Sequence, residues 1–72
     1  MTGEDVRNTL SKNIKKYREA KGLRQADVAI ALDCSYEYIC RVEKGQKYIS
    51  LRKLFELADI LNVKFSDLTN FQ

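Results

Sequence analysis

The sequence contains no histidine, no proline and no tryptophan, and it has only two cysteines. Without histidine, the commonest general acid and base of enzyme active sites is missing. The sequence also lacks a glycine-rich loop between a predicted strand and a predicted helix, which is the usual cradle for a phosphate group. We therefore expect no enzyme activity, no cofactor and no small-molecule ligand.

The two cysteines, Cys34 and Cys40, are too few to form a structural zinc site in a chain without histidine. We expect no metal, and no disulfide either, because thiols stay reduced in the cytosol. Cys34 is predicted to be a small core residue in a turn, and Cys40 to lie partly exposed on a helix. A redox role for Cys40 is left open at this point.

Long apolar runs are absent too. No stretch approaches the roughly 18 apolar residues of a membrane span, and there is no secretory signal. A chain of 72 residues that is 44% hydrophobic and 32% charged has the composition of a globular protein and is too short for two domains. We therefore expect a single domain over residues 1–72, located in the cytoplasm and not in a membrane.

The basic residues are concentrated in two stretches, although the formal net charge is only +3. Residues 12–24 hold six basic residues against one acid, residues 41–53 hold five against one, and the rest of the chain holds two against eight. Either stretch alone is better explained as a solvated helix surface. Together they flank the segment described next, and such sorting of charge is typical of a face that binds nucleic acid.

Residues 24–45 have the spacing of two short helices joined by a tight turn. Apolar residues recur at helical intervals on both sides of the polar segment Asp33-Cys34-Ser35. The Ser35 hydroxyl suits the N-cap of the second helix, and Gly45 suits its end, where a left-handed residue is needed. This pattern predicts a helix-turn-helix unit, whose second helix enters the major groove of DNA.

The flanking segments predict further helices. A first helix of about four turns is indicated by a stripe of apolar residues, Val6, Leu10, Ile14 and Tyr17. It ends at Gly22, and its start is open between Thr2-Gly3 and Asn8-Thr9. Ser50 is expected to cap a fourth helix whose core face is formed by Leu51, Leu54, Phe55, Ala58 and Leu61. Leu57 and Ile60 make a second strip on that helix, and Ser66 is expected to cap a short fifth helix.

The residues from Leu10 to Leu68, about four fifths of the chain, match a known pattern at the correct spacing: Leu10, Ile14, Arg18, Gly22-Leu23, Gln25, Val28-Ala29, Leu32, Ser35, Ile39, Val42-Glu43, Gly45, Ser50-Leu51, Leu54, Ala58, Leu61, Val63 and Leu68. In this pattern the chain resembles the Cro/repressor-type (XRE-like) helix-turn-helix family. The resemblance implies an all-α fold, a compact five-helix lambda-repressor-like domain. In its length the chain is similar to the restriction–modification controller proteins of that family.

The resemblance also implies roles for single residues. The base-contacting positions are occupied by Tyr36, Glu37 and Arg41. The positions that contact the DNA backbone are occupied by Gln25, Lys44, Gln46 and Lys47. Tyr38 and Arg24 are further candidates for backbone contacts, and the alternatives are that the Tyr38 ring covers apolar surface and that Arg24 is a solvent charge. Arg18 and Glu43 match a pair that forms a structural salt bridge between the first and third helices. An acid at position 37 is either a sharp specificity element or a sign that this face does not bind DNA, because phosphates repel it.

Three residues depart from the family pattern. Asp33 replaces the usual glycine of the turn, Arg24 replaces the usual cap of the second helix, and Ile49 replaces a common proline. Aspartate tolerates the left-handed conformation at some cost, so the turn is expected to keep its form.

We expect a sequence-specific DNA-binding transcriptional regulator that binds a pseudo-palindromic operator as a homodimer. The predicted dimer interface consists of apolar residues in excess of what so small a core can bury: Leu57, Ile60, Phe65 and Phe71. The alternative is a protein-interaction module of antitoxin or scaffold type that uses this C-terminal apolar face. The sequence specifies neither the operator nor whether transcription rises or falls.

Overall fold

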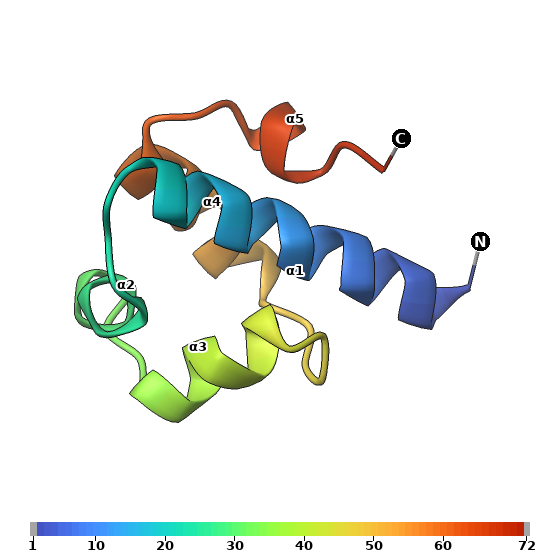
Figure 1. The fold of residues 1–72 in the computed structure, drawn as a ribbon, viewed down its shortest axis with the longest axis horizontal. Coiled ribbons are helices and arrows are strands. Elements are labelled where there is room, and N and C mark those ends of the chain that lie inside the picture. Colours follow the sequence, from blue (N-terminus) through green and yellow to red (C-terminus); the bar gives the residue numbers. More distant parts are fainter. Residues whose placement is uncertain (1, 72) are drawn as a thin grey trace.

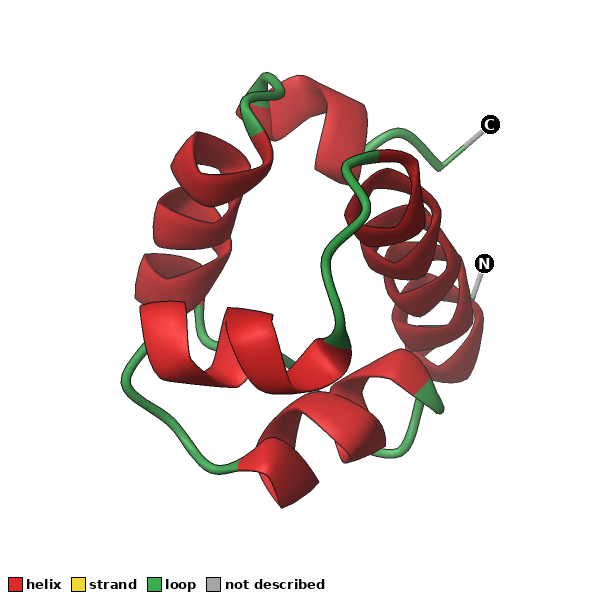
Figure 2. Ribbon diagram, turned by 60° about the vertical axis from the view of Figure 1, so that its left-hand side comes forward, coloured by secondary structure: helices red, strands yellow, loops and turns green. Residues whose placement is uncertain are grey.

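A computed structural model describes residues 2–71, which form five helices and no strand. The helices are α1 (Gly3–Ala20), α2 (Gln25–Ala31), α3 (Tyr36–Glu43), α4 (Leu51–Leu61) and α5 (Phe65–Leu68), shown in Figure 1. The predicted all-α, five-helix fold is confirmed. α2 and α3 lie together on one side, α5 lies on the opposite side, and α1 and α4 connect the two sides (Figures 1 and 2).

The start of α1 is fixed by its N-cap. The Thr2 hydroxyl accepts a hydrogen bond from the Asp5 N–H at 3.1 Å, and the Asp5 carboxylate accepts one from the Thr2 N–H at 3.0 Å. These reciprocal bonds satisfy two of the orphan donors of the first turn, and they lower the pKa of Asp5. Of the two predicted starts, the structure has the one at Thr2-Gly3 rather than the one at Asn8-Thr9.

Four helices in the described part of the chain end at a residue with positive φ: Gly22 (77°), Asp33 (54°), Gly45 (73°) and Asn62 (55°). After each, the next N–H bonds back into the preceding helix, as Cys34 does to the Ala29 carbonyl at 3.0 Å. This arrangement satisfies carbonyls that the helix end leaves free. Asp33 therefore adopts the left-handed turn conformation expected of it. α5 is capped by Lys64 and begins at Phe65, so the predicted Ser66 cap is wrong.

The core is formed by apolar residues from all five helices and from the loop before α4: Leu10, Ile14, Val28, Ala29, Leu32, Ile39, Val42, Ile49, Leu54, Leu57, Ala58, Leu61 and Leu68. α4 is rotated relative to the prediction. Leu57 is 0% exposed, whereas Leu51 and Phe55, both predicted to face the core, are 64% and 52% exposed. Leu57 has no surface left for a second copy, so its assignment to the dimer interface is wrong.

The other three residues of the predicted interface remain accessible. Ile60 and Phe65 are partly buried against the core, and Phe71 is exposed. The Phe65 ring stacks on the Phe55 ring with centroids 4.2 Å apart and planes inclined by 16°. No helix within residues 2–71 is long and apolar enough to cross a membrane.

Candidate nucleic-acid interface

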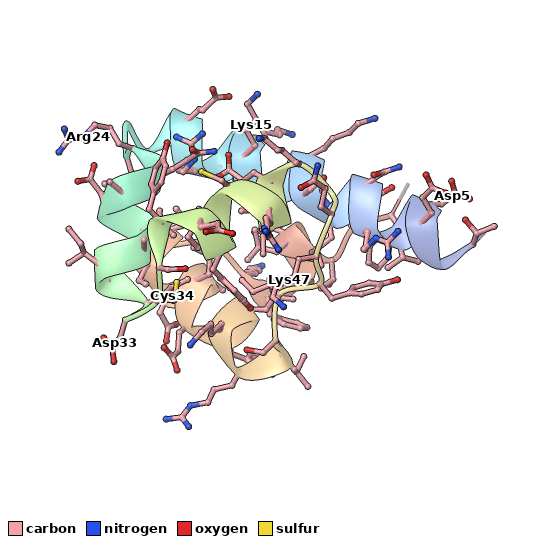
Figure 3. The ribbon with its side chains drawn as sticks, turned by 90° about the horizontal axis from the view of Figure 1, so that it is seen from below. Asp5, Lys15, Arg24, Asp33, Cys34 and Lys47 are labelled. Carbon is pink, nitrogen blue, oxygen red and sulfur yellow. The ribbon has the colours of Figure 1, made fainter. Side chains whose placement is uncertain are left out.

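The solvent face of α3 carries the three residues predicted to contact bases. The helix is only eight residues long, because Ser35 caps its start, accepting a bond from the Tyr38 N–H at 3.0 Å, and Gly45 turns the chain away two residues after Glu43. Tyr36, Glu37 and Arg41 are all exposed on this helix. Seen from the side of α3, the helix crosses the front of the molecule (Figure 3). Its exposed face is thus free of other elements, as entry into a groove requires.

Two of these residues bind each other. The Arg41 guanidinium lies 2.7 Å from the Glu37 carboxylate, one helical turn away, and the side chains are 59% and 71% exposed. An ion pair this exposed is weak, because water solvates both partners. Arg41 is therefore aligned by Glu37 and still available to an outside acceptor.

A shallow hollow of about 270 Å³ lies beside this pair, lined by Ser35, Glu37, Tyr38, Arg41 and Lys47. The Lys47 ammonium lies 5.6 Å from the centre of the Tyr38 ring, within the range of a cation–π contact. Lys47 lies beside α3 in Figure 3, whereas Arg24 and Lys15 lie at the edge of the view. The hollow places one cation of the loop after α3 next to the cation of the helix.

At the start of α3, hydrogen bonding to Cys40 raises the pKa of Tyr36 above its ordinary value of 10.0. The Cys40 thiol donates to the Gln25 side-chain oxygen, at 3.3 Å, and is partly buried, as predicted. Cys34 packs against the core, where burial raises the pKa of its thiol.

A buried ion pair fastens α3 to α1. The Arg18 Nε donates to Glu43 at 2.6 Å and its Nη2 at 3.0 Å, while its Nη1 donates to the Leu23 carbonyl at 2.7 Å. The Glu43 carboxylate raises the pKa of Arg18. Gln25, the first residue of α2, donates to the same carboxylate at 3.0 Å. The predicted structural salt bridge is confirmed, and Gln25 touches α3 as the resemblance implies.

The remaining residues that are predicted to contact the DNA backbone do not all lie at the same end of the helix-turn-helix unit. Lys44 and Gln46 are exposed beyond the end of α3 and lie near Lys47. Arg24 is at the opposite end of the unit, where it pairs with Asp27 at 3.1 Å on the surface. It lacks a capping hydroxyl, as expected, and the Asp27 carboxylate accepts a hydrogen bond from the Arg24 backbone N–H at 2.9 Å.

A model of the helix-turn-helix family matches residues 14–68 of this sequence. The chain belongs to this family. An uncharacterized HTH-type transcriptional regulator of Sinorhizobium fredii, y4dJ, is 31% identical over 64 residues, which make up 89% of this chain and 83% of that protein. The family consists of DNA-binding transcriptional regulators and not of enzymes.

Solved structures of other regulators share the fold. The restriction–modification controller protein C.AhdI from Aeromonas hydrophila superposes with a TM-score of 0.80 at 29% identity, covering 86% of this chain and 94% of that one. The clp gene regulator ClgR from Corynebacterium glutamicum gives 0.84 at 25% identity, covering 88% of this chain and 67% of that one. The family binds double-stranded DNA.

Sequence reasoning missed three residues of interest. Leu51 and Phe55 form an exposed apolar strip on α4, and Tyr48 ties the loop after α3 to the start of α1. The helical spacing of Leu51 and Phe55 signals a strip but does not tell which side faces the core. A tyrosine in a polar loop gives no signal at all of its partner 45 residues away.

Proposed function

We propose that this protein is a sequence-specific DNA-binding transcriptional regulator that inserts α3 into the major groove. The observation that carries the proposal is the exposed α3 face, where Arg41 stands free of other elements beside Lys47, in a chain of a DNA-binding family. Arg41 has the fork of donors that matches guanine O6 and N7. Tyr36 donates from the first turn, and Glu37 accepts from a donor such as cytosine N4.

In this proposal a second set of residues holds the DNA backbone. Lys44, Gln46 and Lys47 extend from the C-terminal end of α3, and Gln25 and Tyr38 lie beside it. Such contacts fix the register of the protein but carry no sequence information directly. Arg24 belongs to this set only if it releases Asp27, to which it is bound in the free protein. In this proposal the protein acts in the cytoplasm, together with the DNA that it binds.

We further propose a homodimer that reads a pseudo-palindrome with half-sites about 34–36 Å apart. The surface that supports it is the strip of Leu51 and Phe55, with Phe65 stacked beneath Phe55. Ile60 and Phe71 are retained as candidates, and Leu57 is not. A two-fold interface of this kind repeats the same patch on both copies.

The first test is selection of binding sites from a random duplex library at about 150 mM salt, with Arg41→Ala in parallel. We expect a symmetric enriched motif that blurs at one base pair per half-site in the variant. No enrichment with either protein would refute DNA recognition by α3. It would favour the alternative, an interaction module of antitoxin or scaffold type.

The second test is the mass of the free protein by sedimentation. Phe55→Ser should shift a dimer toward monomer, because it removes an apolar side chain that the protomer itself leaves exposed. Ile30→Ser is the control, since Ile30 is an apolar residue on α2 that is even more exposed than Phe55, 79% against 52%, and is not part of the strip. A wild-type monomer at every concentration, or equal effects of the two variants, would refute this interface.

A further inference from the structure

The loop between α3 and α4 is held against the first turns of α1. We call residues 44–50 the basic loop, because they contain Lys44 and Lys47. We propose that Tyr48 is a positioning residue that presents the basic loop to the DNA backbone, anchored by Gly3 and Arg7. The inference rests on the proposed function and adds to it a group that does not itself contact DNA.

The anchor consists of two contacts to α1. The Tyr48 hydroxyl donates to the Gly3 carbonyl at 2.6 Å, and the Arg7 guanidinium lies 5.3 Å from the centre of the Tyr48 ring. Arg7 Nε is buried without a hydrogen-bond partner among the described residues. The ring is therefore the group that holds this cation in place, through a cation–π contact. The hydroxyl and the ring face of Tyr48 thus both contact α1.

The basic loop is fixed at other points as well. The Ser50 N–H donates to the Tyr38 hydroxyl on α3 at 3.1 Å, and Lys47 lies over the Tyr38 ring. At the other end, a Cβ on Gly45 would come within 2.5 Å of the Asn8 side-chain oxygen, so the loop passes directly against α1. Lys47 thus lies between an anchor on α3 and an anchor on α1.

The anchors affect DNA affinity because a loop that is mobile in the free protein would have to become ordered when DNA binds. Each residue that becomes fixed on binding loses conformational entropy, and that cost subtracts from affinity. A loop that is ordered in the free protein has already lost this freedom during folding. The match to the family begins at residue 14, so Gly3 and Arg7 lie outside it.

The test is a double-mutant cycle on DNA affinity. Tyr48→Phe keeps the ring over which Arg7 lies and removes only the bond to Gly3. We expect it to weaken binding to the selected site about two- to tenfold, the range of one hydrogen bond, and equally for mismatched sites. In a Lys47→Ala background the same change should have much less effect, because the cation that it positions is gone.

Tyr17→Phe is the matched control. Tyr17 also has a cation over its ring, Lys16 at 5.3 Å, but it lies at the other end of α1, in a hollow with Leu61 and Val63. Tyr17→Phe should leave the affinity for DNA unchanged. Gly3→Ala is a second variant, because its Cβ would meet the Tyr48 hydroxyl at 3.1 Å and push it away without removing any side-chain group. It should weaken binding in the same way as Tyr48→Phe.

Amide hydrogen exchange in the free protein supplies a readout that does not need DNA. Tyr48→Phe should speed exchange at Gly45 and Gln46 and leave the centre of α1 unchanged. If the wild type does not bind DNA, the proposed function fails. If the wild type binds and Tyr48→Phe alters neither affinity nor loop exchange, or if its effect persists undiminished without Lys47, the positioning role is refuted.

Discussion

Two of the arginine–glutamate pairs among residues 2–71 are nearly equal in length but lie in opposite surroundings. Arg18 and Glu43 approach to 2.6 Å with side chains 10% and 3% exposed, and Arg41 and Glu37 approach to 2.7 Å with side chains 59% and 71% exposed. The first joins α1 to α3, and the second lies within one turn of α3. The same chemistry thus holds α3 to the protein at one point and faces solvent at another.

The difference teaches that burial, and not distance, separates a structural ion pair from one available for binding. Water competes for both partners of the exposed pair, so its net contribution is small. The buried partners are shielded from water. Arg18 therefore depends on Glu43 and the Leu23 carbonyl as acceptors, and Glu43 depends on Arg18 and the Gln25 amide as donors. A ligand can therefore displace Glu37 from Arg41 but not Glu43 from Arg18.

The largest effect is expected from Arg18→Ala. It leaves the Glu43 carboxylate buried without its cation, so the free energy of unfolding should fall by about 3–5 kcal/mol. Urea denaturation followed by circular dichroism measures it. Replacing both partners by apolar residues, Arg18→Met with Glu43→Leu, should cost less than the single change. A loss under about 1 kcal/mol for Arg18→Ala would mean that the pair behaves like an exposed one.

Arg41→Ala should have the opposite profile. Stability should change by less than about 0.5 kcal/mol, whereas affinity for the selected site should fall by about 1–3 kcal/mol with relaxed preference at one base pair. Thermal melting and equilibrium DNA titration on the same sample give the two numbers. A large loss of stability with unchanged preference would show that Arg41 is a structural residue.

Some of the residues that separate the structural part of the molecule from its exposed face could be predicted from the sequence, and others could not. The partners Arg18 and Glu43 came from a family resemblance, and the helix ends came from glycine and serine chemistry at Gly22, Gly45 and Ser35, which acts locally. The side of α4 that faces the core could not be predicted from the sequence. Apolar residues occur at seven of its eleven positions, so two stripes have helical spacing, and only packing against the other helices buries Leu57 rather than Phe55.

Glu37→Gln sharpens the comparison from the other partner. It removes the exposed pair, so the free energy of unfolding should fall by only about 0.3–0.5 kcal/mol. Affinity for arbitrary duplex DNA should rise, because a charge that phosphates repel is lost, and discrimination among sites should narrow. Competition with non-specific DNA at two salt concentrations measures both the non-specific affinity and the discrimination among sites. Weaker binding to every sequence would show that Glu37 serves DNA binding mainly by aligning Arg41.

The smallest effect concerns the exposed pair of Arg24 and Asp27. Hydrogen bonds from the side chain and backbone of Arg24 lower the pKa of Asp27. The stability gained is present above the ordinary aspartate pKa of about 3.9 and is lost as pH falls through the lower folded value. Asp27→Asn should thus lower the melting temperature at pH 6 but not at pH 2. Asp59→Asn, at an exposed site on α4, is the control substitution.

The left-handed residues that end four helices also bear on how quickly the chain folds. Gly22, Asp33, Gly45 and Asn62 each reverse the chain sharply, so most neighbours in space are neighbours in sequence. Helical proteins with such local contacts fold within microseconds to milliseconds. Synthesis proceeds at about 5–20 residues per second. The time needed to make a folded protomer is therefore set by the ribosome, and folding adds no measurable delay to it.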